Sequence, residues 1–117
     1  MKNLFMRTLV LLLSASVTQQ AFAAYECNAK ITNVLVYSDG SLNILHTGRG
    51  DYTVVCNLNA EWKGVSVTTC VTWFALLEAA KRRNGTVNFY YAGDGSCATL
   101  PTYGSAPAPG YIGDVQG

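Results

Sequence analysis

The sequence of 117 residues has little charge and a single histidine, and these shortages exclude several classes of protein. Only 13% of its residues are charged, and the formal net charge is +1. A disordered acidic or basic tail needs far more charge of one sign, and a general nucleic-acid binder needs a basic surplus to neutralise phosphates. We therefore expect one folded domain and no nucleic-acid partner.

The sequence also lacks an apolar run long enough to cross a bilayer. Its N-terminus instead has the three parts of a secretory signal peptide, namely Lys2 and Arg7, the apolar residues 9–13, and the small-x-small site Ala21-Phe22-Ala23. We predict a signal peptide at 1–23 and an exported domain at 24–117, in the periplasm or secreted, without a membrane span. The mature domain would carry six basic and seven acidic residues.

The cysteines lack the Cys-x-x-Cys spacing of zinc and thioredoxin-type redox sites, so we expect no metal and no cofactor. An even number of cysteines in a small exported domain predicts two disulfides. Of the three connectivities we favour the nested one, Cys56 with Cys70 inside Cys27 with Cys97. In the chain-entropy model the inner link stabilises by about 3 kcal/mol and the outer by about 4.

Hydrophobic periodicity predicts five strands and one helix. The strands are expected near residues 28–38, 42–47, 52–58, 86–92 and 111–115, and the helix begins at Val67 and ends at Arg83 before Asn84-Gly85. A change of alternation near Asn33 predicts a β-bulge. Strict alternation in the third strand places Tyr52, Val54, Cys56 and Leu58 on one face.

This order of elements, β-β-β-α-β-β, predicts a mainly β fold with one helix. It is the order of a small OB-like Greek-key barrel in which the helix plugs one end. A two-layer sandwich of a sheet and a helix has the same order and stays open as an alternative. The two disulfides fit either fold.

The residues give little support for catalysis, and we expect no enzyme and no catalytic residues. The sequence has no nucleophile elbow, zinc-protease helix or phosphate loop. His46 falls in step with Leu42 and Ile44 on a strand, which favours a hydrogen-bonded strand histidine over a general base.

One face of the helix carries only small residues, Thr68, Thr72, Ala75 and Ala79, before Arg82 and Arg83. A plain solvent-exposed face explains them. The alternative is a helix that packs closely against helices of other subunits.

Several short motifs together resemble those of pertussis-like A–B toxin binding (B) subunits, of the typhoid toxin and subtilase cytotoxin type. They are Tyr37-Ser38-Asp39, Leu45-His46-x-Gly48, Tyr52 leading to Cys56, Cys70, Trp73, Phe74 with Leu76-Leu77, Gly85-x-Val87 and Tyr90. The chain is also similar, and closer in length and helix, to small uncharacterised secreted bacterial proteins. That second resemblance is carried by Cys56-Asn57-Leu58, Cys70 to Trp73 and Tyr90-Tyr91, and implies no activity.

The toxin-subunit resemblance implies an OB barrel, a homo-oligomeric ring of five with helices lining the pore, and binding of sialylated glycans. The serine of the family's Tyr-Ser motif, which contacts the sugar, corresponds to Ser38. Tyr37 would contact apolar sugar faces, and Asp39 completes the predicted ligand site. The chain departs from the family at Gly40, because Ser38-Asp39-Gly40 also fits an ordinary turn, and in the link between Cys27 and Cys97.

These patterns lead to two hypotheses of different class. The first is a non-enzymatic binding module for a glycan, of the B-subunit type. The second is a monomeric periplasmic structural or inhibitor-like protein that contacts another protein.

Overall fold

The computed structural model describes Ser16 and residues 23–115, so the predicted signal peptide lies outside the described residues except for Ser16 and Ala23. The elements are β1 (Ala24–Val36), β2 (Ser41–His46), β3 (Tyr52–Asn57), α1 (Val67–Arg82), β4 (Thr86–Ala92), the 3-10 helix η1 (Cys97–Thr99) and β5 (Tyr111–Val115). The prediction of five strands and one α-helix in this order is confirmed, with each boundary within four residues of the expected one.

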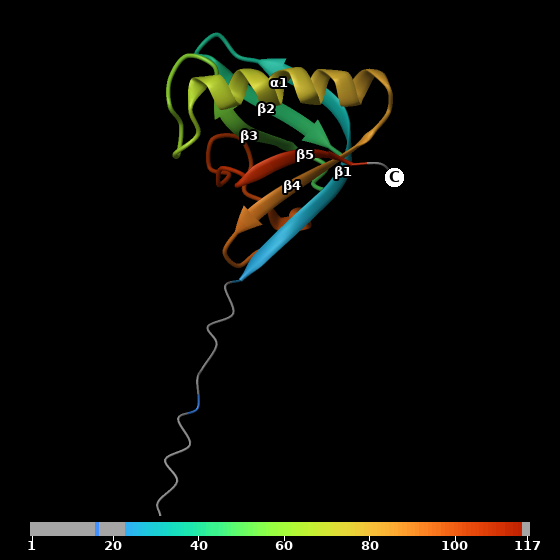
Figure 1. Cartoon of the computed structure of the whole chain (residues 1–117), viewed down its shortest axis with the longest axis vertical. Helices are drawn as coiled ribbons and strands as arrows, with labels where there is room; N and C mark the ends of the chain where they lie inside the picture. Colours follow the sequence, from blue (N-terminus) through green and yellow to red (C-terminus); the bar gives the residue numbers. More distant parts are fainter. Residues whose placement is uncertain (1–15, 17–22, 116–117) are drawn as a thin grey trace, which may run out of the picture.

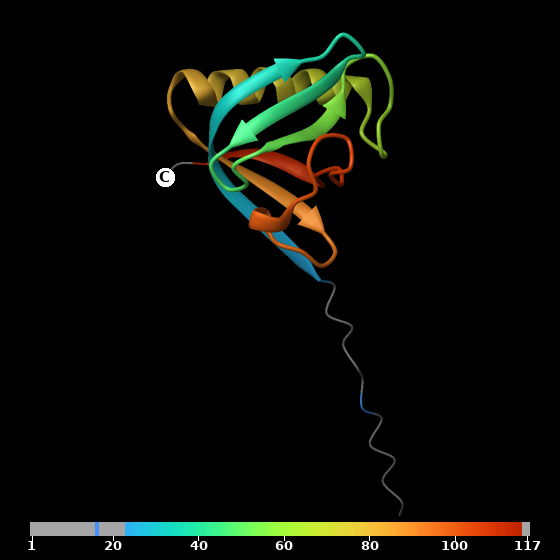
Figure 2. The same cartoon turned by 180° about the vertical axis from the view of Figure 1, so that it is seen from behind.

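The long strand β1 joins two halves of one antiparallel sheet with the order β3-β2-β1-β4-β5. The N-terminal half of β1 pairs with β4, and its C-terminal half pairs with β2. Between them the register shifts at Ile31 and Asn33, so the predicted bulge is confirmed. A bulge bends its strand and increases the local twist. The sheet therefore curls around a common interior, as Figures 1 and 2 show.

The curled sheet is not a closed barrel, which corrects the expected OB-like closure. In the described residues β3 and β5 are the two free edges. One isolated parallel bridge, between Thr53 and Tyr103, lies at the β3 edge. The Tyr103 N–H donates to the Tyr52 carbonyl at 2.8 Å, and its carbonyl accepts the Val54 N–H at 3.1 Å. The segment before β5 therefore occupies the place beside β3 that a closing strand would take.

Helix α1 lies across one end of the curled sheet and packs against β1, β3, β4 and β5 (Figure 1). Its start is fixed by Ser66, whose hydroxyl accepts the Thr69 N–H at 3.1 Å. Its buried residues recur at helical spacing and join the core from both halves of the sheet. They are Cys70, Trp73, Leu77 and Ala80. The helix ends before Asn84 in the left-handed region, φ 55°.

Two nested disulfides fasten the ends of this arrangement, as predicted. Cys56 of β3 joins Cys70 of α1, and Cys27 of β1 joins Cys97 of η1. Cys27, Cys56 and Cys70 belong to the hydrophobic core, and Cys97 packs against it. A domain of this size buries a limited apolar area, so covalent links contribute much of its stability.

The predicted alternation of β3 is wrong in one respect. A register shift pairs Leu42 with Cys56 but Asn43 with Val54, which leaves Val55 without an opposite residue. In consequence all four residues from Thr53 to Cys56 are buried rather than every second one. A bulge needs only one extra residue, and the apolar run here gives no sequence signal for it.

Among the described residues, no helix is long and apolar enough to cross a membrane. The same part of the chain holds no group of three or more metal-ligating side chains.

Candidate functional site

The three residues predicted to bind ligand lie together in the tight turn between β1 and β2. The Gly40 N–H donates to the Tyr37 carbonyl, and the Tyr37 N–H donates to the Ser41 carbonyl, both at 2.9 Å. Gly40 has φ +90°, and a Cβ atom there would come within 2.6 Å of the Asn57 side chain. Glycine is therefore required for this turn on both conformational and steric grounds.

The turn is also bound to the end of β3, which makes it rigid. The Gly40 carbonyl accepts the Leu58 N–H at 2.8 Å, and the Asp39 carbonyl accepts the Asn57 side-chain amide at 3.2 Å. The Asp39 carboxylate accepts the Ser41 N–H at 2.9 Å, and this bond lowers the pKa of Asp39. Asp39 thus has the structural role that an ordinary Ser-Asp-Gly turn gives to its aspartate.

Ser38 and Tyr37 are both available to a partner. The Ser38 side chain is exposed, and in the described part of the chain neither its hydroxyl nor its backbone N–H has a hydrogen-bond partner. The Tyr37 side chain is 41% exposed. The turn therefore presents one aromatic ring and two adjacent donors on a fixed backbone.

Beside this turn, one buried residue of β2 has an unpartnered polar group. Leu35 is two residues before Tyr37, is partly exposed, and is paired with Asn43 of β2. Asn43 is only 1% exposed, yet its side-chain oxygen has no partner among the described residues. Figure 2 shows this half of the sheet, with β1, β2 and β3 in front of α1 and no helix over its outer side.

His46, the single histidine, lies in the core rather than in a cleft. It has no exposed surface and stacks on Phe89 with ring centroids 4.9 Å apart. Its Nδ1 accepts the Gly48 N–H at 3.1 Å, so the neutral ring carries its proton on Nε2. Burial, with the nearby Arg49 charge, lowers the pKa of His46 to about 4. A substrate would not reach this ring without opening the core.

A cavity of about 460 Å³ lies between the start of α1 and the segment before β5. Its lining includes Lys63, Val65, Thr69, Trp73 and Pro109. This volume is within the usual range for sites that bind small molecules. No pattern in the sequence indicates this cavity.

Lys63 is the one cation that lines this cavity, and two backbone carbonyls hold it in place. Its ammonium donates to the Gly104 and Ala106 carbonyls at 2.9 and 2.6 Å. It also lies 4.6 Å from the centre of the Trp62 ring. Lys63 has φ 47° and Gly64 has φ 84°, the conformation of a two-residue hairpin turn. This turn contributes both Lys63 and Gly64 to the lining of the cavity.

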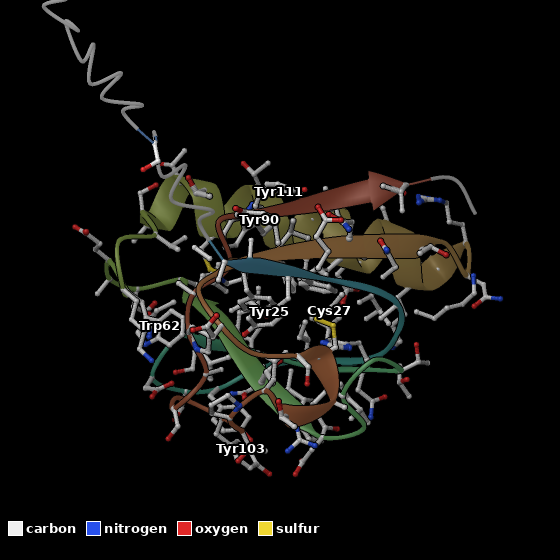
Figure 3. The ribbon with its side chains drawn as sticks, turned by 90° about the horizontal axis from the view of Figure 1, so that it is seen from below. Tyr25, Cys27, Trp62, Tyr90, Tyr103 and Tyr111 are labelled. Carbon is white, nitrogen blue, oxygen red and sulfur yellow. A yellow bond between two sulfur atoms is a disulfide. The ribbon has the colours of Figure 1, made fainter. Side chains whose placement is uncertain are left out.

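A stacked aromatic pair joins β4 and β5. Tyr90 and Tyr111 stack with centroids 5.0 Å apart, and the Tyr111 hydroxyl donates to Glu26 at 2.7 Å, which raises the pKa of Tyr111. Gly110 lines the cavity and lies under the Tyr90 ring. Figure 3 shows this pair on one side of the domain and Tyr103 on the opposite side.

The sequence held partial signals for these features. Ser66 before an apolar stripe is a typical helix N-cap, and Ser66 and Thr69 both line the cavity where α1 begins. The opposite wall comes from a stretch rich in proline, alanine and glycine, residues 106–110, which reads only as a loop. Its position depends on long-range contacts with Lys63 and Tyr90, which no local pattern specifies.

The chain matches no protein-family model, no curated protein and no solved structure.

Proposed function

We propose that this protein is an exported, non-enzymatic carbohydrate-binding module that recognises sialylated glycans through the turn at residues 37–40. The observation that carries the proposal is the pairing of the free Ser38 donors with the exposed Tyr37 ring on one rigid turn. An aromatic ring suits the apolar face of a sugar, and adjacent hydroxyl and amide donors suit its carboxylate. Because five hydrogen bonds fix the turn before binding, little conformational entropy is lost on binding.

The state of His46 supports a function without catalysis. A general base must reach a proton of its substrate and needs a pKa near the working pH. His46 is enclosed, and its pKa lies well below neutrality. We therefore assign His46 to the core.

Two disulfides support export, because such links persist in oxidising compartments. The expected signal peptide at 1–23 directs the chain to export. We place the mature domain in the periplasm or outside the cell.

The outer face of α1 supports assembly into a ring of five. Thr68, Thr72 and Ala75 are exposed, and Val71 beside them is 52% exposed. Small side chains let helices approach closely, and an exposed valine gains from being covered. In this proposal the turn at residues 37–40 contacts the ligand, and α1 contacts the neighbouring subunits.

A second function, contact with another protein by a monomeric structural or inhibitor-like domain, is favoured by one observation. Leu35, Val36 and Tyr37 are consecutive, apolar and at least 37% exposed. Consecutive residues of a strand point to both of its faces, so a protein that grips this strand end from both sides would bury all three. A glycan would cover one face only.

A glycan array probed with the purified, oxidised protein tests the carbohydrate proposal. We expect signals on sialylated glycans and none on the same glycans without sialic acid. An array without sialoside signals would remove the proposed function and leave the protein-contact alternative.

A further inference from the structure

Strand β5 is a free edge of the sheet, and it lacks the features that usually protect such an edge. In the described part of the chain, no backbone–backbone hydrogen bond of residues 111–115 reaches any segment other than β4. The register with β4 is unbroken, and β5 contains neither proline nor lysine, which commonly block strand addition. Its one charged residue, Asp114, is paired with Arg83. The opposite edge differs, because Tyr103 already bonds to β3.

Cross-strand pairing arranges the outer face of β1, β4 and β5 in three rows, because opposed residues of paired strands share a face. The rows, each given from β1 to β5, are Glu26, Tyr90 and Tyr111; Asn28, Asn88 and Gly113; and Lys30, Thr86 and Val115. The alternate residues of these strands, such as Phe89 and Ile112, belong to the hydrophobic core. The three rows therefore face away from the core, and each row ends at the free edge.

The Tyr111 ring leans across the sheet and turns one face to solvent. Its hydroxyl donates to Glu26 at 2.7 Å, although Glu26 lies on β1, two strand spacings or about 10 Å away. The ring therefore leans towards Tyr90, and the planes of the two rings are 11° from parallel (Figure 3). One face of the Tyr111 ring packs on Tyr90, yet Tyr111 remains 45% exposed. The free face is available to a partner.

This ring has an unbalanced negative charge beside it. Among the described residues, no ion pair includes Glu26. The hydroxyl of Tyr111 donates to this carboxylate, which makes the electron-rich face of the ring still more attractive to a cation. An arginine side chain suits such a face, because its planar guanidinium stacks on aromatic rings. The first row therefore favours an arginine in a strand added at the edge.

The other two rows favour uncharged residues. A Cβ atom at Gly113 would meet only the Asn88 side chain, at 4.0 Å, so the surface above this glycine is open to a large side chain. Val115 is 37% exposed and gains from apolar contact. Cross-strand pairs of this kind stabilise a sheet. An added strand thus gains most from an aromatic residue in the second row and an aliphatic residue in the third.

We propose that β5 binds an extended peptide segment of another protein as a sixth, antiparallel strand. An arginine of this segment lies opposite Tyr111, an aromatic residue opposite Gly113 and an aliphatic residue opposite Val115. Because the strand runs antiparallel, the segment has the order aliphatic-x-aromatic-x-arginine. Its main chain pairs with the free edge, and its alternate side chains give specificity. This surface is distinct from the turn at residues 37–40 and goes beyond the glycan proposal.

NMR titration of the isotope-labelled, oxidised protein with the peptide acetyl-Thr-Val-Thr-Phe-Thr-Arg-Thr-amide tests this proposal. We expect the amide signals of residues 111–115 to shift together with one dissociation constant, and those of β3 to stay in place. Hydrogen exchange in β5 should slow, because its outward N–H groups gain partners. No shift at about 1 mM peptide, or equal shifts at both edges of the sheet, would overturn the proposal.

A matched ligand and a matched pair of variants test the arginine. Citrulline has the shape of arginine without its charge, so the citrulline peptide should bind about fivefold more weakly. Glu26→Gln removes the carboxylate charge and should reduce this difference between the two peptides. Glu61→Gln, at another exposed glutamate, should leave the difference as in the wild type. Equal binding of both peptides to the wild type would contradict the place assigned to the arginine.

The open surface over Gly113 tests the register. Gly113 does not have the positive φ that favours glycine, and its Cβ position is free of close contacts, so Gly113→Val should fold. This variant should bind the peptide about tenfold more weakly, because valine takes the space of the phenylalanine. It should bind a peptide with alanine in place of phenylalanine as the wild type does. An equal loss for both peptides would contradict the register.

The result is separable from the glycan proposal. Ser38→Ala changes the turn and leaves β5 intact, so it should bind the peptide with the affinity of the wild type. A loss of peptide affinity in this variant would contradict the location at β5. An array without sialoside signals, in contrast, would remove the glycan proposal and leave peptide binding at β5 as it stands.

Discussion

The Asp39 carboxylate accepts the backbone N–H of Ser41 at 2.9 Å and so fixes the turn that carries Ser38. The bond lowers the pKa of Asp39, so the carboxylate is favoured in the folded chain. The contribution of this bond to the stability of the fold is complete at a pH above the usual aspartate pKa. It is lost as the pH falls through the lowered pKa of Asp39.

Asp39→Ala should therefore loosen the turn without unfolding the domain. We expect a several-fold loss of sialoside affinity, because the ligand would then have to order the turn. Asp39→Asn keeps an acceptor oxygen and should retain most of the affinity. Calorimetric titration of both variants checks this, and an equal loss in both would show that the charge itself contacts the ligand.

The burial of His46 predicts a loss of stability in mild acid. The unfolded histidine takes up a proton near pH 6.5, whereas the folded one does so at about pH 4, so the unfolded state binds more protons in between. Stability should fall as the pH drops from about 7 to 4, by about 3 kcal/mol from this group. Urea unfolding of the wild type and of His46→Gln measures it. If the variant has the same pH slope as the wild type, the ring is not the cause.

The nested disulfides predict unequal losses on removal. The link between Cys27 and Cys97 spans 70 residues, and that between Cys56 and Cys70 spans 14. The chain-entropy model predicts losses of about 4 and about 3 kcal/mol for the two paired serine variants. Urea denaturation of each double variant checks the order. A larger loss for the short loop would indicate that packing around Cys70 outweighs chain entropy.

The outer face of α1 predicts the oligomeric state. Native mass measurement of the oxidised protein should give five subunits. Ala75→Arg places a long charged side chain on the exposed small-residue face and should give single subunits with unchanged circular dichroism. A wild-type mass of one or two subunits would favour the monomeric protein-contact alternative.

Much of the fold was predictable from local patterns. The period of α1, the glycine turn at Gly40 and the bulge near Asn33 each have a short-range cause, and each is present. These three features depend on neighbours in sequence, which periodicity and turn chemistry describe. The favoured nested disulfide pairing is present as well, although its outer link joins residues 70 apart.

The open edge and the cavity were not predictable in the same way. Tyr103 takes the place of a closing strand beside β3, and Lys63 reaches carbonyls more than 40 residues away. The burial of four consecutive residues of β3, Thr53 to Cys56, accompanies a shift in its register with β2 at Asn43. These contacts depend on how segments distant in sequence pack together. The residue type at one position does not predict them.

The central claim is that Ser38 contacts the ligand directly. The most direct measurement is the affinity of Ser38→Ala for the strongest sialoside of the array, beside Ser105→Ala as a control on another exposed loop serine. We predict that Ser38→Ala loses about tenfold or more in affinity, since a hydrogen bond to a charged group is removed, while Ser105→Ala binds like the wild type. Unchanged binding by Ser38→Ala would contradict the account.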